Sequence, residues 1–409
     1  MPSVAATDIN CWVPNSFPIA STGEGVLSGK TVAVKDLVDY AGHKVSFGLA
    51  RWRDTHEVSK ETAPILTQLL EAGGSIAGFT KLDQLAYSLI GNVCEGTPPL
   101  NSLYPDRFTG GSSSGPAAAV AGGLADIGLG TDTAGSIRVP AASCGLFGLR
   151  PTHGAISVSG VRPLAPSFDV VGVFTANPTL IGPAFNVLSS APVPTGNDVQ
   201  EVRVPMRASV SLVGDHTVDS MYSIADALSA VYECRVIQCD LSGFINPDIG
   251  DLFARLQGRE IWSEHSQWIS ENKGNLADDV RARLERAERL SMSSDEEKTE
   301  DKAAREKYRK DFQGFYNSYS VLALPVLTDL APLRTSSADE LLEFRTKSFQ
   351  LTAPSSFTGC PQLVVPVRNE SASKVIGVGL LGQHNNEATL LRAATLLTGV
   401  KDLLTMQEP

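Results

Sequence analysis

Hydroxyl groups are concentrated in two short, glycine-containing stretches of this sequence. The first, residues 110–115, reads GGSSSG, and the second, residues 131–138, reads TDTAGSIR and contains Ser136. A serine hydroxyl is a weak nucleophile at its ordinary pKa and requires a neighbouring base. Lysine can be that base when it is buried, because burial disfavours its charged form. Lys35, which ends the apolar run at 32–34, is a candidate for such burial.

The second stretch also offers backbone donors for a negatively charged oxygen. Consecutive N–H groups come from Thr133, Ala134, Gly135 and Ser136, and the two small residues allow a substrate carbonyl to come close. These groups are the material of an oxyanion hole. Each feature alone has a simpler interpretation, since a lysine at a strand end is usually solvated and a glycine–serine loop is usually a flexible connection. Their combination and order favour a serine hydrolase whose base is a lysine.

The elements that must position these residues indicate an α/β fold. Residues 31–39 predict a strand that runs out at Lys35, and residues 61–72 predict a helix that stops at a glycine pair before a short strand at 75–79. The further elements that we expect are a helix at 116–124, strand and loop at 128–140, helices at 252–291 and 293–316, a strand at 321–325, a helix at 338–351, strands at 362–367 and 375–381, and a helix at 386–397.

The middle of the chain differs in character from the rest. Residues 185–320 are charged, poor in glycine and mostly helical in pattern. We therefore expect this segment to be a variable helical region that sets substrate specificity, as an insertion or lid on the glycine-rich core. The whole chain, residues 1–409, is expected to form a single domain.

The composition limits the classes of function. Hydrophobic residues make up 42% and charged residues 19%, which allows a large buried core, and the formal net charge of −11 argues against a general nucleic-acid binder. We find no signal peptide and no run of ~18 apolar residues, so we expect no membrane partner. The six cysteines are scattered without a CxxC pair, and HExxH is absent, so we expect no metal and a cytoplasmic compartment.

A longer motif contains both of these short stretches. Residues 110–154, GGSSSGPAAAVAGGLADIGLGTDTAGSIRVPAASCGLFGLRPTHG, together with the upstream VAVKD, resemble the amidase signature family. Ser112 and Ser136 lie 24 positions apart, which is the separation in that family. The resemblance covers residues 30–164 strongly and resumes weakly at 322–325 and 358–363. A motif of this length does not arise readily by chance.

The resemblance implies a role for each residue. Ser136 is the nucleophile, and Ser112, expected on a cis peptide bond, passes its proton to a neutral Lys35, which later returns it to the leaving amine. Two further sets are implied: an oxyanion hole of Thr133, Ala134, Gly135 and Ser136, and loop supports Ser113, Asp132 and Arg138. Ala134 stands where the family usually has glycine. Its methyl group could narrow the pocket without removing a donor.

The implied fold is a single α/β domain with a mixed β-sheet core surrounded by helices. The implied reaction is hydrolysis of a small carboxylic amide through an acyl-serine intermediate, with no cofactor and with a homodimer left open. The length favours compact members that hydrolyse amides such as indole-3-acetamide. Carbamate, urea-type, ester or aryl-amide hydrolysis stays open. So do two other roles: an inactive amidase-fold protein that serves in binding or assembly, or one component of an amidotransferase.

Two other motifs suggest different chemistry. Gly111 to Gly115 also satisfies GxSxG, the nucleophile elbow of α/β-hydrolases, in which Ser113 would attack with a later aspartate and histidine. That interpretation leaves Lys35 unexplained, and residues 106–109 make a poor strand before the elbow. Residues 25–31, GVLSGKT, imitate a phosphate-binding loop but have three residues between the glycines where four are required.

Overall fold

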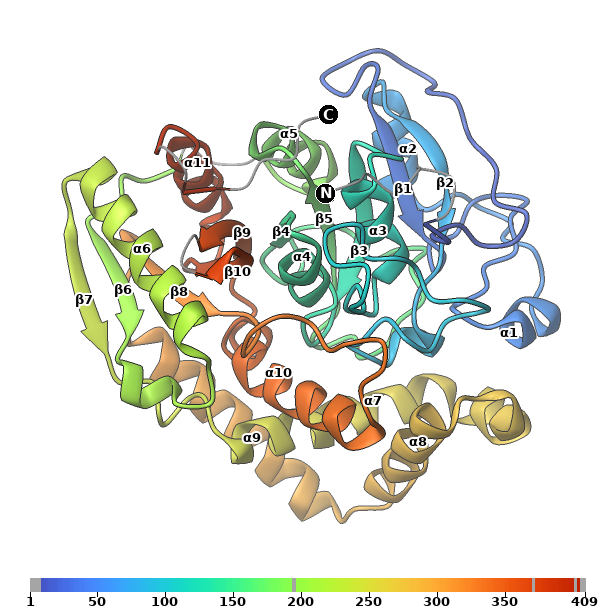
Figure 1. The fold of residues 1–409 in the computed structure, drawn as a ribbon. Helices are drawn as coiled ribbons and strands as arrows, with labels where there is room; N and C mark the ends of the chain where they lie inside the picture. The colour runs from blue at the N-terminus through green and yellow to red at the C-terminus, as the bar shows by residue number, and fades with distance from the viewer. Residues whose placement is uncertain (1–8, 193–195, 370–371, 401–402, 405–409) are drawn as a thin grey trace.

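The computed structural model describes residues 9–192, 196–369, 372–400 and 403–404. In these ranges eleven α-helices lie around one mixed sheet of ten strands, in the order β2-β1-β3-β5-β4-β9-β10-β8-β6-β7 (Figure 1). The strands are β1 (Thr31–Lys35), β2 (Ser75–Thr80), β3 (Ile127–Asp132), β4 (Phe147–Arg150), β5 (Val170–Thr175), β6 (Glu201–Pro205), β7 (Arg235–Cys239), β8 (Ser320–Pro325), β9 (Gln362–Asn369) and β10 (Lys374–Leu381). The helices are α1 (Ala50–Thr55), α2 (Pro64–Glu71), α3 (Ser114–Ala121), α4 (Arg138–Cys144), α5 (Pro178–Leu188), α6 (Asp215–Tyr232), α7 (Pro247–Asn272), α8 (Asp278–Ser291), α9 (Asp295–Gln313), α10 (Ala338–Thr358) and α11 (Glu387–Leu397). The predicted fold class, a mixed sheet core surrounded by helices, is confirmed.

Parallel strands form both ends of the sheet, and antiparallel pairs form its middle. β1 lies parallel between β2 and β3, and β6 lies parallel between β8 and β7. The pairs from β3 through β5, β4, β9 and β10 to β8 are antiparallel. Because β1 and β3 are parallel, their carboxyl ends, at Lys35 and Asp132, lie at the same edge of the sheet. The two predicted catalytic stretches therefore meet there.

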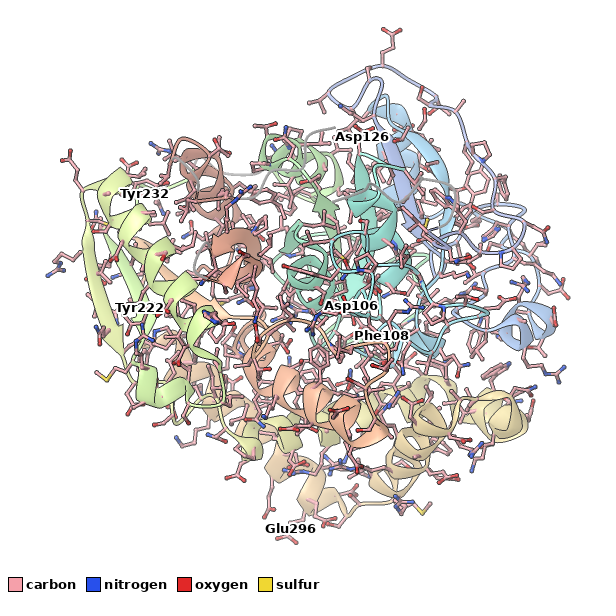
Figure 2. The ribbon with its side chains drawn as sticks, in the orientation of Figure 1. Asp106, Phe108, Asp126, Tyr222, Tyr232 and Glu296 are labelled. Atoms are coloured by element: carbon pink, nitrogen blue, oxygen red, sulfur yellow. The ribbon has the colours of Figure 1, made fainter. Side chains whose placement is uncertain are left out.

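The start of β1 is fixed by Asp126, just before β3. Its carboxylate accepts hydrogen bonds from the Thr31 N–H and the Thr31 hydroxyl, both at 2.9 Å, and from Lys30 Nζ at 3.1 Å. Figure 2 shows Asp126 at the end of the molecule away from helices α7 to α10. The strand that follows is rich in β-branched residues and is buried from its second residue on. Its buried far end carries Lys35.

The segment 185–320 contains more than helices. It supplies the long helices α7, α8 and α9, as predicted, and also β6 and β7, which were not predicted and which extend the sheet. β7 is only partly buried, so it lacks the apolar alternation of a buried strand. Helices α7, α8 and α9 lie with α10 along one side of the molecule (Figure 1), and α7 packs against both α8 and α10.

Two boundaries near the site differ from those predicted. The stretch at 128–140 was expected to be strand and loop, but α4 already begins at Arg138. Pro140 is compatible with this helix because it stands in the first turn, where an N–H is not needed. Helix α10 continues past the predicted end at 351 to Thr358, and Gly359, with φ of 70°, ends it. The extra turns of α10 contact the loop that carries Ser136.

Candidate active site

Lys35 ends β1 with a wholly buried side chain. Its Nζ lies 2.8 Å from the hydroxyl oxygen of Ser112 and 2.9 Å from that of Thr131. Thr131 belongs to β3, the parallel neighbour of β1. The sheet therefore brings the predicted base and the predicted bridging serine into direct contact.

The environment of Lys35 favours the neutral amine. Burial lowers the pKa of Lys35 to about 7, although the carboxylates of Asp83, Asp132 and Asp169 act through space in the opposite direction. Hydroxyl groups both donate and accept hydrogen bonds. A neutral amine can therefore donate to Thr131 while its lone pair accepts the proton of a neighbouring serine. This is the state that a general base requires.

Ser112 follows a cis peptide bond from Gly111, as the resemblance implies. Its carbonyl oxygen accepts a hydrogen bond from the N–H of Asp83 at 3.1 Å. The Asp83 carboxylate in turn accepts the N–H groups of Gly91 at 2.9 Å and Val93 at 3.1 Å. A Cβ at position 111 would lie 2.0 Å from an Asp83 carboxylate oxygen, so only glycine fits there. These contacts hold the serine loop with one hydroxyl turned to the buried amine.

Asp132, at the end of β3, is bound by two buried arginines. Arg138 donates to it from Nε and Nη2, both at 2.9 Å, and Arg150 donates from Nη1 at 3.0 Å. Asp132 also accepts the N–H groups of Gly135 at 2.8 Å and Ile137 at 3.1 Å. Burial opposes ionisation, but the charges of Arg138 and Arg150 outweigh it and hold the pKa of Asp132 well below its usual range. The carboxylate thus fixes the turn that leads into α4.

Arg138 ties the same loop to the second half of the chain. Its Nη1 donates to the Thr352 carbonyl at 2.7 Å and to Gln362 Oε1 at 2.9 Å, and its Nη2 donates to the Ser356 hydroxyl at 2.9 Å. The Thr352 hydroxyl donates to the Ala134 carbonyl at 2.6 Å. These contacts agree with the supporting role predicted for Arg138.

One of the four predicted oxyanion donors is already engaged within the protein. The N–H of Gly135 already donates to Asp132 at 2.8 Å, and a single proton cannot serve both that carboxylate and an oxyanion at full strength. The N–H groups of Thr133, Ala134 and Ser136 make no hydrogen bond to any described residue. Three of the four predicted donors are therefore free to face a ligand.

Ser136 borders a small pocket, with about 10 Å³ open to the centre of a water-sized molecule. Its hydroxyl makes no hydrogen bond to Ser112 or to any other residue in the described ranges. The pocket is lined by residues of the loop at 86–89, the loop at 133–136, α7 and α10. They are Ala86, Tyr87, Ser88, Leu89, Ala134, Ser136, Gln257, Arg345 and Phe349. The methyl group of Ala134 borders the pocket, as its departure from glycine suggested. Arg345 and Phe349 lie outside the segment 185–320, where the specificity region was expected.

The Ser113 hydroxyl is used within the fold. It donates to the Thr131 carbonyl at 3.2 Å and accepts the Thr131 N–H at 3.4 Å. In the described residues no strand lies between β2 and the serine loop, and Ser113 makes no hydrogen bond to a histidine. A nucleophile elbow requires a strand directly before the serine and a histidine bonded to it. The geometry therefore does not fit an elbow at Ser113, whose supporting role stays a prediction.

Three residues of the site were not identified from the sequence: Thr131, Asp83 and Arg150. Thr131 begins the quoted stretch TDTAGSIR, and its place on a strand parallel to β1 was the available signal. Arg150 lies in the quoted motif as well, in FGLRP, but nothing there shows that it reaches back to Asp132. Burial lowers the pKa of Arg150 to about 10, against the pull of Asp132. Asp83 had no local signal, because its role depends on the fold of the 83–93 loop.

The described residues offer neither a metal centre nor a membrane-spanning helix. Among the described residues, no group of three or more His, Cys, Asp or Glu side chains is arranged to hold a metal ion. All six cysteines are free. None of the helices within the same ranges combines the length and the apolar character that a bilayer span requires.

Comparison with known proteins assigns the family. Residues 18–191 and 215–391 match the family model described as Amidase. The chain is 32% identical over 392 residues to Amidase 1 of Oryza sativa subsp. japonica, covering 89% of each chain. It is 30% identical over 388 residues to "Translocon at the outer membrane of chloroplasts 64" of Pisum sativum, covering 89% of this chain and 65% of that protein.

A solved structure shares the fold. Allophanate hydrolase from Kluyveromyces lactis superposes with a TM-score of 0.82 at 23% identity, covering 91% of this chain and 62% of that chain. At this identity the likeness shows the architecture alone. Together with the sequence matches, it agrees with the resemblance seen in the motif. The chain belongs to the amidase signature family, and its class is that of amide hydrolases.

Proposed function

We propose that this protein hydrolyses the C–N bond of small carboxylic amides through an acyl-serine intermediate on Ser136. The observation that carries the proposal is the buried amine of Lys35, 2.8 Å from the hydroxyl of Ser112. A lysine in this environment is a base near neutral pH. No histidine is needed in this scheme.

Acylation consumes the amide and moves one proton along the triad. Ser136 Oγ attacks the carbonyl carbon, its proton passes to Ser112 Oγ, and the proton of Ser112 passes to the neutral Lys35 Nζ. The tetrahedral intermediate then collapses, the C–N bond breaks, and the proton returns through Ser112 to the leaving nitrogen. The products are the acyl-enzyme and ammonia or an amine. Water then attacks the ester and releases the carboxylic acid, with the proton following the same route.

The developing negative charge is stabilised by backbone donors. In our proposal the N–H groups of Thr133, Ala134 and Ser136 face the oxygen, and the bond from Gly135 to Asp132 holds the turn in place. Such preorganised donors are worth roughly a factor of 10²–10³ in kcat each. Carbamates, ureas, esters and aryl amides develop the same oxyanion, so the triad alone does not discriminate among them. A component of an amidotransferase would also use this scheme.

The test is intact-protein mass spectrometry after treatment with a fluorophosphonate. The wild-type protein is expected to gain one adduct, Ser136→Ala to gain none, and the matched control Ser113→Ala to be labelled like wild type. Labelling of Ser136→Ala at the wild-type rate would place the nucleophile elsewhere. An unlabelled wild-type protein would instead support a binding protein with an inactive site.

A further inference from the structure

Arg345 is a buried cation in the pocket of the nucleophile, and none of the described carboxylates pairs with it. The residue lies on α10, is 8% exposed, and lines the pocket together with Ser136. It forms no ion pair or hydrogen bond with any described residue, and its Nε is buried without an acceptor. Two other buried arginines, Arg138 and Arg150, both bind the carboxylate of Asp132. No carboxylate in the described part of the chain therefore balances the charge of Arg345, and an anionic ligand would do so.

The neighbours of Arg345 do not replace such a group. Its guanidinium lies 4.3 Å from the ring centroid of Phe349 and 5.6 Å from that of Tyr87. Ring faces attract a cation far less than a carboxylate in contact does. The nearest charges include the like charge of Arg283, which itself binds Asp279 at 2.9 Å. Asp279 is thus already paired with Arg283.

Arg345 remains charged at neutral pH. Burial, reinforced by the like charges of Arg283 and Arg286, lowers the pKa of Arg345 to about 9, against the opposing effects of Tyr87 and Asp279. A guanidinium offers a planar fork of donors that matches the two oxygens of a carboxylate. The ligand that best matches Arg345 is therefore a planar anion, such as a carboxylate.

A second side chain in the pocket also lacks a partner. Gln257, on α7, is 2% exposed, and its Oε1 is buried without a hydrogen bond to any described residue. The oxygen and nitrogen of a glutamine amide can exchange places, so the group can accept or donate. Buried polar groups are normally satisfied, and each exception calls for an explanation. Two exceptions in the pocket that contains Ser136 point to a polar ligand.

The size of the pocket limits that ligand. The space open to the centre of a water-sized molecule is about 10 Å³, close to the minimum that holds a single water. A short substrate therefore requires less rearrangement of the lining side chains than a bicyclic aromatic group such as indole.

We propose that the substrate is the monoamide of a short dicarboxylic acid, with Arg345 binding the free carboxylate and Gln257 contacting its polar atoms. The inference rests on the proposed function and adds the substrate class to it. The reaction is ⁻OOC–R–CO–NH₂ + H₂O → ⁻OOC–R–COO⁻ + NH₄⁺. The C–N bond breaks at Ser136, and the distal carboxylate is unchanged.

The first experiment compares two substrates that differ only at the distal group. Succinamate carries the carboxylate, and succinamide has a neutral amide of nearly the same shape. The wild-type protein is expected to hydrolyse succinamate with a kcat/KM about 10²-fold higher. Equal kcat/KM values for the two, or faster hydrolysis of indole-3-acetamide, would overturn the proposal.

Substitution of the arginine tests its part in that ratio. Arg345→Met is expected to lose most of the preference for succinamate, mainly through KM, and to change succinamide hydrolysis by only a few fold. Arg345→Lys is expected to restore part of it. The matched control is Lys347→Met, which removes one positive charge from α10 at a residue paired with Glu343. An equal loss for both substrates in Arg345→Met would show a structural role and contradict the inference.

A binding measurement separates failure of this inference from failure of the proposed function. Succinate, the product, is expected to bind wild type and Ser136→Ala in calorimetry and to raise their unfolding temperature, but not that of Arg345→Met. Succinate binding without any turnover would refute the amidase and retain the anion site. Amide turnover without succinate binding would refute the anion site and retain the amidase.

Discussion

Two buried charged sites lie at the carboxyl ends of β1 and β3, and their surroundings shift the pKa of each in a different way. One is the cluster around Asp132, and the other is Lys35. Asp132 contacts Arg138 and Arg150 directly, and all three side chains are wholly buried. Lys35 is equally buried, but its hydrogen-bond partners are two hydroxyl groups. The pKa of Asp132 is held well below its usual range, whereas that of Lys35 falls to about 7. Burial alone does not decide the charge of a side chain, because contact with an opposite charge can reverse its effect.

The Asp132 cluster is therefore suited to a structural role, and Lys35 to proton transfer. The pKa of Asp132 lies well below its usual range, so its carboxylate can hold a turn in place but does not exchange protons near neutral pH. The Lys35 site keeps its amine close to the point at which it gains or loses a proton. A general base must be able to do both. Substitutions in the Asp132 cluster should therefore lower stability first, and substitution of Lys35 should lower activity first.

The largest expected effect follows removal of the amine. Lys35→Met should lower kcat/KM by a factor on the order of 10⁴, because Ser112 then has no base to accept its proton. The measurement is amide hydrolysis at pH 8, with the rate of fluorophosphonate labelling as a second readout. Activity within tenfold of wild type would remove lysine from the mechanism.

The same variant should gain stability toward low pH. The pKa of Lys35 is about 7 in the fold against 10.5 for the free side chain, so between these values the unfolded state binds more protons. The free energy of unfolding of wild type therefore rises with pH across this window, and the burial penalty is fully present below pH 7. Lys35→Met lacks this titration. Its stability relative to wild type should be most favourable below pH 7 and should decline by pH 10, as measured by urea unfolding.

Breaking the paired cluster should act on stability first. Asp132→Asn leaves two buried guanidinium groups without their counter-charge and should destabilise the protein by about 3–5 kcal/mol in urea unfolding. Glu343→Gln, which breaks the exposed pair with Lys347, is the control and should cost about 0.5 kcal/mol or less. If the two variants were equally stable, the cluster would not hold the loop.

A smaller effect should appear in the pH profile. Wild-type kcat/KM should rise with pH through an apparent pKa near 7, as Lys35 loses its proton. Among the carboxylates that raise the pKa of Lys35, Asp83 has the largest effect, and burial raises the pKa of Asp83 itself to about 6. Asp83→Asn removes that charge above pH 6, so the rising limb should move to lower pH by an amount on the order of one unit. A lower plateau with an unmoved limb would mean that Asp83 only supports the serine loop.

The sequence pointed to the candidate triad residues and to strands β1, β2 and β3 because their signals are local, whereas β4 and β5 were not predicted. The strand at 31–35, the helix before Gly73 and the motif at 110–154 each carry their information in consecutive residues. Arg345 and Gln257 carry none, since each is an ordinary helix residue until α7 and α10 fold against the loop at 86–89. The use of the Gly135 N–H by Asp132 could not be read from the sequence either, because it depends on the turn geometry. β6 and β7 were missed because short and partly exposed strands show little apolar pattern.

The smallest expected effect concerns histidine. His153 donates from Nε2 to the Pro166 carbonyl oxygen at 3.0 Å, and it lines a pocket with His384 that does not contain Ser136. His153→Ala should therefore keep kcat/KM within about a factor of three of wild type. A histidine-based triad predicts the reverse, a loss as large as that of Lys35→Met. Measuring both variants on one substrate at one pH decides between the two bases, because only the true base combines a large loss of activity with an intact fold.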